Sequence, residues 1–522
     1  MSPLAEGADQ LAAEVAGELG IAVIVPLPMP VADYLQDFSC PDAMERFNDL
    51  CGQATSLFVL TSETTARARD EHYAELGVFL ASHCHILLAI WDGVESNELG
   101  GTSQVVRFHH DDIMPGYQPK SGVSQQMLVD DESDLVYHIV CSRARPDGEP
   151  ADGLVPLSVC WFTKDETTPR SEELPAAHDA IFQRASEFSR DAMRFSSQIE
   201  VESYPLLTGD GEALGIDGLA DIDRVFRAAD YLAIRYQKKT LRTLRVSHVL
   251  AFIMGTLFVL YSDLATWQSL LYAFLGCFVI ATAVQAVANH RGWNRKYLDY
   301  RTLAEGLRVQ FHWAMAGITQ RNLEQYSHDN FLQLQDPELG WIRNTMRIAG
   351  LKNDSIPHIE SAALDIAMND WVGDSESGQL GYYRKKAEER MRRHRMTEAL
   401  GQVSLFTSAS VVVLFIVAGQ SMPEAYVDPL LAVMGITLLL FGVRHAYAHA
   451  IAEKELIKQY EFMLRIFVNA KLRLTKSEDD EQRRQVLMAL GSSALDEHAQ
   501  WILMNRERSV SQQEIWRIGS GS

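Results

Sequence analysis

The chain has 522 residues, of which 47% are hydrophobic and 22% are charged, a composition typical of globular proteins that argues against wholesale disorder. This length is enough for three or four domains of roughly 150 residues each. The formal net charge of -22 at pH 7 would repel a phosphate backbone, which excludes a general nucleic-acid binder. The cysteines are scattered without a CxxC pair or a Cys/His metal spacing, so we predict neither a disulfide framework nor a metal site.

The first segment, up to about residue 110, alternates between helix and strand patterns. A helical stripe of apolar residues begins at Leu4 and stops at Gly20; because the stretch also contains acids, it predicts a helix rather than a signal peptide. Further helices are expected at 43–54 and 69–83, between apolar strands at 21–25, 56–60 and 85–91. Strands separated by helices favour an α/β Rossmann-like fold with an open, doubly wound parallel sheet.

One strand of that sheet is missing from the pattern. The first residues already read as the loop and helix that follow a strand, with no strand before them. Two explanations stay open: the chain starts downstream of an ancestral first strand, or another segment fills the slot. The apolar stretches 135–142 and 154–163 are the candidates for the second explanation.

In open α/β sheets, ligands bind beyond the carboxyl ends of the strands. The segments at that edge are Pro26–Pro28, Thr61–Thr64 and Asp92–Thr102. Glycines permit close approach of a ligand to the backbone, and the free N–H groups at the start of a helix attract anions. A nucleotide would fit such an edge, with its phosphate on a helix end and its ribose hydroxyls on Asp92 or Asp9. The alternative is that the glycines only turn the chain.

The candidate ligand-binding residues lie at two loop-to-helix junctions and one strand end on this edge. They are Ser2, Glu6, Gly7, Asp9, Pro26, Asp92, Gly93, Gly100, Gly101 and Thr102.

The second half of the chain contains four apolar segments without Asp, Glu, Lys or Arg, at 246–262, 267–287, 403–419 and 430–443. The fourth needs neighbours such as Arg444 to complete its span, which we place at 430–446. The second is long enough to cross ~30 Å of hydrocarbon as a helix, and the others lie near the lower limit of about 17 residues. Buried helices of a soluble bundle are the alternative. The short connector within each pair favours two membrane hairpins, and long helices are expected on either side of each hairpin.

Basic residues set the orientation of these hairpins. They flank both of them, as Lys238, Lys239, Arg242, Arg245, Arg291, Arg295, Lys296, Arg390, Arg392, Arg393, Arg395, Arg444 and Lys454, whereas the connectors 263–266 and 420–429 contain no Lys or Arg. By the positive-inside rule, both termini and all large polar parts are cytoplasmic, in a multi-pass protein of the inner (plasma) membrane. The predicted domains are 1–205, a linker and helix at 206–245, a first hairpin unit at 246–382 and a second at 383–522.

The polar residues within the spans are mild ones. Gln285, Ser404, Thr407 and Ser408 are the candidates for helix packing or for a pore lining. A coupled transporter would need an ionisable group at membrane depth, and His248 lies near a span end. The small residues around Ser404 and Ser408 suit helix–helix packing in a homo-oligomer; alternatively they are hydroxyls tolerated within lipid.

Three ordered motifs resemble the SLOG superfamily: "SPLAEGADQLAAEVA" (2–16), "VIVPLPMPVADYLQDF" (23–38) and "LLAIWDG" with "GGT" (87–93 and 100–102). The resemblance implies a Rossmann-like sensor of a nucleotide-derived messenger, such as a cyclic oligonucleotide or an ADP-ribose derivative. Downstream, "YLDYRTLAEGLRVQFHW" (297–313) and "LGSSALDEHAQWILMNRER" (490–508) resemble SLATT-type two-transmembrane effectors, which implies membrane disruption or pore formation in bacterial antiphage defence.

Enzymatic relatives of the SLOG superfamily carry PGGxGTxxE, in which the glutamate serves glycosidic cleavage. In "GGTSQVV" (100–106), Val105 stands at that position, and valine can neither take up a proton nor stabilise a ribosyl cation. We therefore expect binding without turnover and name no catalytic residue. Two alternatives stay open: a membrane-tethered hydrolase of a nucleotide N-glycosidic bond, and a nucleotide-independent channel or scaffold.

Overall fold

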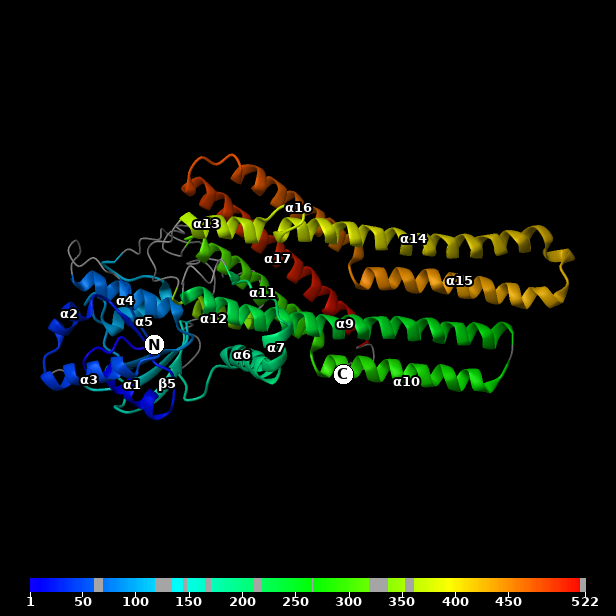
Figure 1. Cartoon of the computed structure of the whole chain (residues 1–522). Helices are drawn as coiled ribbons and strands as arrows, with labels where there is room; N and C mark the ends of the chain where they lie inside the picture. The colour runs from blue at the N-terminus through cyan, green and yellow to red at the C-terminus, as the bar shows by residue number, and fades with distance from the viewer. Residues whose placement is uncertain are drawn as a thin grey trace. The chain divides into compact units, whose positions relative to one another are not determined.

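The computed structural model describes residues 1–60, 69–117, 134–143, 148–164, 170–209, 217–264, 266–318, 337–352 and 361–516 of the chain (Figure 1). The chain forms two compact units. The first, called the head unit, comprises Met1–Ser196, Pro205–Phe226 and Gly306–Glu360, and the second, called the helical unit, comprises Ser197–Tyr204, Arg227–Glu305 and Ser361–Ser522. The units interleave along the chain, whereas the sequence predicted consecutive boundaries at 205, 245 and 382. Two helices, α9 (Asp217–Asp263) and α11 (Trp293–Met315), each begin in one unit and end in the other.

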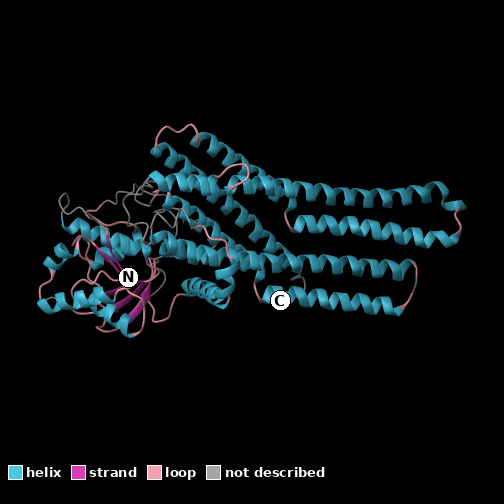
Figure 2. Ribbon diagram, viewed as in Figure 1, coloured by secondary structure: helices cyan, strands magenta, loops and turns pink. Residues whose placement is uncertain are grey.

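The head unit is an α/β structure, and Figure 2 shows the described strands in this unit. In chain order its elements are α1 (Ala8–Glu18), β1 (Ile24–Leu27), α2 (Val31–Tyr34), η1 (Leu35–Asp37), α3 (Pro41–Gln53), β2 (Ser56–Val59), α4 (Arg69–His83), β3 (Leu87–Trp91), α5 (Thr102–Asp111), β4 (Val136–Val140), β5 (Val159–Phe162), α6 (Ala176–Arg194), η5 (Pro337–Leu339) and α12 (Gly340–Gly350).

The strands form two sheets in the described residues. In the first, β1 pairs with β2 in parallel; in the second, the order is β3-β4-β5, with β3 and β4 parallel and β4 and β5 antiparallel. A parallel α/β arrangement is therefore present; among the described residues the strands form these two sheets, and a single continuous open sheet is not shown. The candidates 135–142 and 154–163 contain β4, which pairs with β3, and β5, which pairs with β4, so neither pairs with β1 in the described sheets.

The start of the chain lies along the free edge of β1. The carbonyl groups of Val23 and Leu27 accept hydrogen bonds from the β2 side, so Ile24 and Pro26 face the opposite edge, where the Ser2 N–H donates to the Ile24 carbonyl at 3.0 Å. Pro26 is the next residue of β1 that faces this edge, and as a proline it has no N–H to donate there. The prediction that the strand ends before Pro26 is wrong, because Pro26 lies buried inside β1.

The core around β1 explains why the first fifty residues fold together. Val25 and Leu27 are fully buried, and Tyr34 makes edge contacts with Phe38 at 5.4 Å and with Phe47 at 5.8 Å between ring centroids. Burying each such side chain contributes ~1.5–3 kcal/mol. Pro41 at the start of α3 supplies the fixed φ of a first helical turn.

The helical unit is built from long helices. These are α7 (Ser196–Glu202), most of α9, α10 (Gln268–His290), most of α11, α13 (Ser361–Ala367), η7 (Met368–Val372), α14 (Gly378–Ala418), η8 (Gly419–Ser421), α15 (Glu424–Ala450), α16 (Glu453–Leu474) and α17 (Asp480–Trp516).

Four of these helices are long and apolar enough to cross a membrane: α9, α10, α14 and α15. Only 6%, 0%, 22% and 6% of their most apolar windows is buried within the chain. A soluble bundle would hide such windows in its core, so the low burial favours lipid-facing helices over that alternative. The predicted spans at 246–262, 267–287, 403–419 and 430–446 fall within these helices or reach one residue past them.

Candidate functional site

The carboxyl end of β3 carries the first predicted candidate, Asp92. Its side chain is 1% exposed and forms an ion pair with Arg143, with Arg143 Nε 2.5 Å from Asp92 Oδ2. A second guanidinium nitrogen lies 3.4 Å from Oδ1, and the Val94 N–H donates to the same oxygen at 3.1 Å. The carboxylate expected to meet ribose hydroxyls is therefore held by the protein itself, through two charge-assisted contacts and one backbone donor.

Gly93 has the positive φ of 78° that glycine tolerates, but its face is covered. A Cβ at this position would clash with the Cδ1 atom of Leu154, and the Ala151 N–H donates to the Asp92 carbonyl at 2.8 Å. The backbone of Asp92 and Gly93, which was expected to face a ligand, is thus in contact with residues 151–154. A ligand over Asp92 and Gly93 would have to displace them.

Two further side chains lie at this edge. His138 on β4 is fully buried and its Nε2 lies 3.0 Å from the Trp91 carbonyl, while its Nδ1 lies 3.1 Å from a guanidinium nitrogen of Arg170. Burial and Arg170 lower the pKa of His138, although the Trp91 carbonyl and Asp92 oppose the shift. The neutral ring therefore donates from Nε2 to Trp91 and accepts at Nδ1 from Arg170.

Sequence reasoning missed Arg143, His138 and Arg170. It applied the carboxyl-end rule to the first three strands only, although Arg143 lies in the segment that follows β4, which ends at Val140. Applying the same rule to β4 would have selected it.

The glycines before α5 have a packing role. Gly100 has φ 77°, and a Cβ there would lie 2.7 Å from Tyr73 Cβ and 2.9 Å from the Ala74 backbone nitrogen on α4. Gly101 is the residue before the first turn of α5, which begins at Thr102 as predicted, and no side chain caps that turn. The alternative that these glycines shape the chain accounts for Gly100 without any ligand.

The junction before α1 is closed by its own hydrogen bonds. The Ser2 hydroxyl donates to the Asp9 carbonyl at 2.9 Å, and the Glu6 carboxylate accepts from the N–H and the hydroxyl of Ser39, both at 2.7 Å, which lowers the pKa of Glu6. Burial raises the pKa of Asp9 to about 6. Gly7 has φ 100° and open space where a Cβ would point. Because two carboxyl groups flank this helix start, it favours a phosphate less than a helix end without them would.

Two groups of contacts can be followed among the ten candidates. Asp9 lies near Tyr34, whose ring centroid is 6.2 Å from that of Tyr73, and Tyr73 is the residue against which Gly100 packs. These residues therefore gather around the Tyr34–Tyr73 pair, whereas Asp92 and Gly93 lie with Arg143. The predicted edge segment Thr61–Thr64 lies outside the described residues.

Val105, which stands at the position of the catalytic glutamate in the enzymatic relatives, faces α4. A Cβ on Gly77 would lie 2.6 Å from the Val105 Cγ2 atom. The side chain at this position thus fills a helix–helix contact in the α4–α5 layer. Among the described residues, no group of three or more His, Cys, Asp or Glu side chains is placed to hold a metal ion.

The polar candidates within the spans divide into two kinds. Ser404 and Ser408 are buried on α14, and the Ser408 hydroxyl lies 2.7 Å from that of Thr437 on α15 and 3.2 Å from the Met434 carbonyl. Thr407 is half-buried and donates to its own helix, and Gln285 contacts Asn289 on the same helix at 3.0 Å. The two serines lie where α14 meets α15, and the other two residues make no contact with another span in these hydrogen bonds.

Glycines bring the two hairpins together. A Cβ on Gly255 of α9 would clash with Leu439 of α15, and a Cβ on Gly435 of α15 would lie 3.2 Å from Val259 of α9. Nearer the basic flank, Arg245 donates to the Tyr447 hydroxyl at 3.3 Å. Residue numbers rise on one helix as they fall on the other, so α9 and α15 pack antiparallel at close range.

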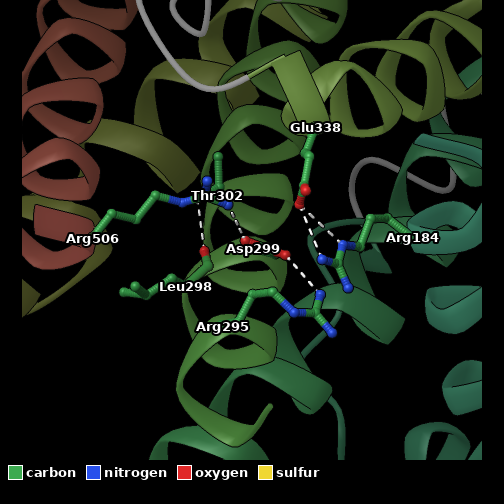
Figure 3. A network of polar contacts seen from close by, with 7 residues as sticks. All are labelled: Arg184, Arg295, Leu298, Asp299, Thr302, Glu338 and Arg506. Atoms are coloured by element: carbon green, nitrogen blue, oxygen red, sulfur yellow. Dashed lines mark hydrogen bonds and ion pairs between the residues drawn. The ribbon is translucent and has the colours of Figure 1, made fainter. Parts of the chain in front are cut away.

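Ion pairs hold the helices beyond the spans. Glu453 at the start of α16 lies 2.9 Å from His394 on α14 and 3.4 Å from Arg444 on α15. Asp299 on α11 bridges Arg295, at 3.1 Å, and Arg506 on α17, at 2.6 Å (Figure 3). The head unit has its own pair in the same picture, Arg184 with Glu338 at 3.0 Å.

A groove of about 520 Å³ lies between α16 and α17. Its lining combines the cations Arg473 and Lys476 and the amides of Asn469 and Gln485 with apolar side chains. The turn between the helices also carries acids, since Asp479 accepts the Gln482 N–H at 2.7 Å. These charges of opposite sign make the groove a weaker anion site than an arginine beside a sheet edge.

A scan against protein-family models finds no match, and searches of curated proteins and of solved structures find none either.

Proposed function

We propose that the chain is a bacterial membrane protein in which the head unit binds a nucleotide-derived messenger and thereby controls the four spans. The proposal is carried by one observation: the same chain has an α/β unit, in which the buried Asp92 is paired with a half-buried Arg143 at a sheet edge, and four apolar helices that the chain leaves largely unburied. The resemblance to SLOG and SLATT modules supports a role in antiphage defence. A cyclic oligonucleotide or an ADP-ribose derivative is the proposed messenger, and a homo-oligomer in the inner membrane the proposed assembly.

Coupling from ligand to membrane requires that the messenger favour one of two arrangements, since equal affinity for both shifts nothing. The helices α9 and α11 support such coupling, because each contributes residues to both units. Displacing the residues that contact Asp92 and Gly93 is the change that a messenger would drive. The spans would then open a pore or disrupt the bilayer.

The test is ion flux through liposomes that contain the purified full-length protein. Candidate cyclic oligonucleotides and ADP-ribose derivatives are added one at a time, with protein-free liposomes and heat-unfolded protein as controls. We expect flux with one class of nucleotide and none without it. Absence of flux with all of them, together with absence of any nucleotide-dependent shift in the unfolding temperature, would contradict the proposal.

A nucleotide-independent channel or scaffold is the second candidate, and the covered edge at Gly93 favours it. Flux that is constant with and without nucleotides would support it. The hydrolase alternative has its own readout, the release of free base from a nucleotide, which Asp92→Ala would abolish.

A further inference from the structure

We propose that Arg143 exchanges partners when the messenger binds: it holds the Asp92 carboxylate in the ligand-free protein and moves to a phosphate group of the ligand, which leaves Asp92 to accept hydrogen bonds from ribose hydroxyls. This inference rests on the proposed function. It names the chemical class that the site takes, a molecule with a phosphate and free ribose hydroxyls in one piece.

The exposure of the pair sets the order of events. The Asp92 side chain is 1% exposed, whereas that of Arg143 is 33% exposed. A ligand can therefore reach the guanidinium from solvent before it can reach the carboxylate. A guanidinium fork matches a phosphate as well as a carboxylate, so the arginine can transfer from one to the other with its hydrogen bonds kept.

The burial of Asp92 makes the exchange selective. Taking Arg143 away leaves a carboxylate in a site closed by residues 151–154, and an unpaired buried charge is strongly destabilising. Inorganic phosphate provides no donor for Asp92 in return, and a nucleoside provides donors but no anion for Arg143. Only a ligand that carries both replaces both halves of the ion pair.

The neighbouring contacts keep the strand end in place during the exchange. The Trp91 carbonyl is bonded to His138, which is bonded to Arg170, and the Cys141 N–H donates to the same carbonyl at 3.1 Å. Arg170 also lies over the Phe162 ring, 4.3 Å from its centroid. The end of β3 is thus anchored on β4, and Arg143 is the charged group beside it that is free of this anchor.

The test measures binding of ADP-ribose, adenosine and inorganic phosphate by calorimetry to the full-length protein in detergent. The variants are Asp92→Asn, Arg143→Gln, and the double variant with both changes, and Arg473→Gln on α16 is the matched loss of an arginine elsewhere. Because Arg143→Gln leaves Asp92 unpaired and can fail to fold, the double variant removes both charges and keeps the site neutral. Circular dichroism checks the fold of each.

We expect Asp92→Asn to bind inorganic phosphate roughly tenfold more tightly than the wild type, because its arginine is released, and the double variant to lose that gain. We expect the wild type to prefer ADP-ribose to both fragments, the double variant to lose that preference, and Arg473→Gln to behave as the wild type. Equal binding of ADP-ribose by the wild type and all variants would overturn the exchange and leave the proposed function standing. Absence of ADP-ribose binding to the wild type, with no gain of phosphate binding in Asp92→Asn, would overturn the exchange; the proposed function falls only if no nucleotide of any class produces flux.

Discussion

Individual residues selected for ligand binding serve the packing of the protein in several places. Gly100 allows α5 to start against the backbone of α4, and Gly93 makes room for Leu154. Both uses need the same property, the absence of a Cβ, so the residue type alone does not distinguish them. Gly7 is different, because open space surrounds the position where its Cβ would point. The atoms that surround each glycine, and not the residue type, therefore decide whether it serves packing.

Glu497 on α17 should make the stability of the protein depend on pH near neutrality. Burial and the nearby Glu305 raise its pKa from 4.5 to about 7, against the hydrogen bond from Gln459. The folded state therefore holds a proton that the unfolded chain releases, and stability falls as the pH rises from about 4.5 to 7. The loss amounts to ~3 kcal/mol at most.

The variant Glu497→Gln keeps the shape and removes the charge. We expect it to unfold at a higher temperature than the wild type at pH 8 and at the same temperature at pH 4.5, as measured by circular dichroism in detergent. The exposed Glu481→Gln on the same helix is the control and should change neither value. A gain of the same size at both pH values would point to packing rather than to a buried charge.

At the scale of elements, the close contact between α9 and α15 depends on two glycines. A Cβ on Gly255 would clash with Leu439, and Gly276 on α10 has nothing within 4 Å of the same position. These two residues form a matched pair, since both lie within apolar helices of the same hairpin. They differ only in what faces them.

We expect Gly255→Ala to lower the free energy of unfolding of the helical unit by ~1–3 kcal/mol, because α9 and α15 must move apart. Gly276→Ala should be neutral or slightly stabilising, since alanine is the better helix former. Thermal unfolding of the two variants in the same detergent compares them directly. Equal unfolding temperatures would show that the two hairpins do not pack through this contact.

The sequence predicted the elements better than their partners. Apolar runs gave the five strands within a few residues and the four long apolar helices, because burial leaves a local pattern. Asp92 and Arg143 are 51 positions apart, and no local pattern joins them. Pro26 shows an error in a strand boundary: the strand was expected to end before the proline. A proline can lie within a strand at a sheet edge, because its missing N–H then faces away from the paired strand. Pairing across distance, rather than element type, limited the candidate site.

At the scale of the whole molecule, two helices, α9 and α11, contribute residues to both units. α9 is 47 residues long, ~70 Å as a helix, whereas the hydrocarbon layer is ~30 Å thick, so it extends well beyond any membrane it crosses. Its polar part belongs partly to the head unit and its apolar part to the helical unit. Under the proposed function, α9 is the segment along which a change in the head unit would reach the spans.

The membrane orientation predicted from the basic residues can be tested with cysteines. Because Lys and Arg flank the hairpins and are absent from the connectors, Thr266→Cys and Ser421→Cys should react with a membrane-impermeant maleimide on intact cells. Lys454→Cys at the start of α16 should react only after the membrane is opened. The wild-type protein, whose cysteines all lie in the predicted cytoplasmic parts or in a span, should stay unlabelled on intact cells and serves as the control. Labelling of Lys454→Cys on intact cells without labelling at residues 266 and 421 would show that the orientation is the opposite of the predicted one. The head unit would then face away from any messenger made in the cytoplasm, which would contradict the proposed function as well.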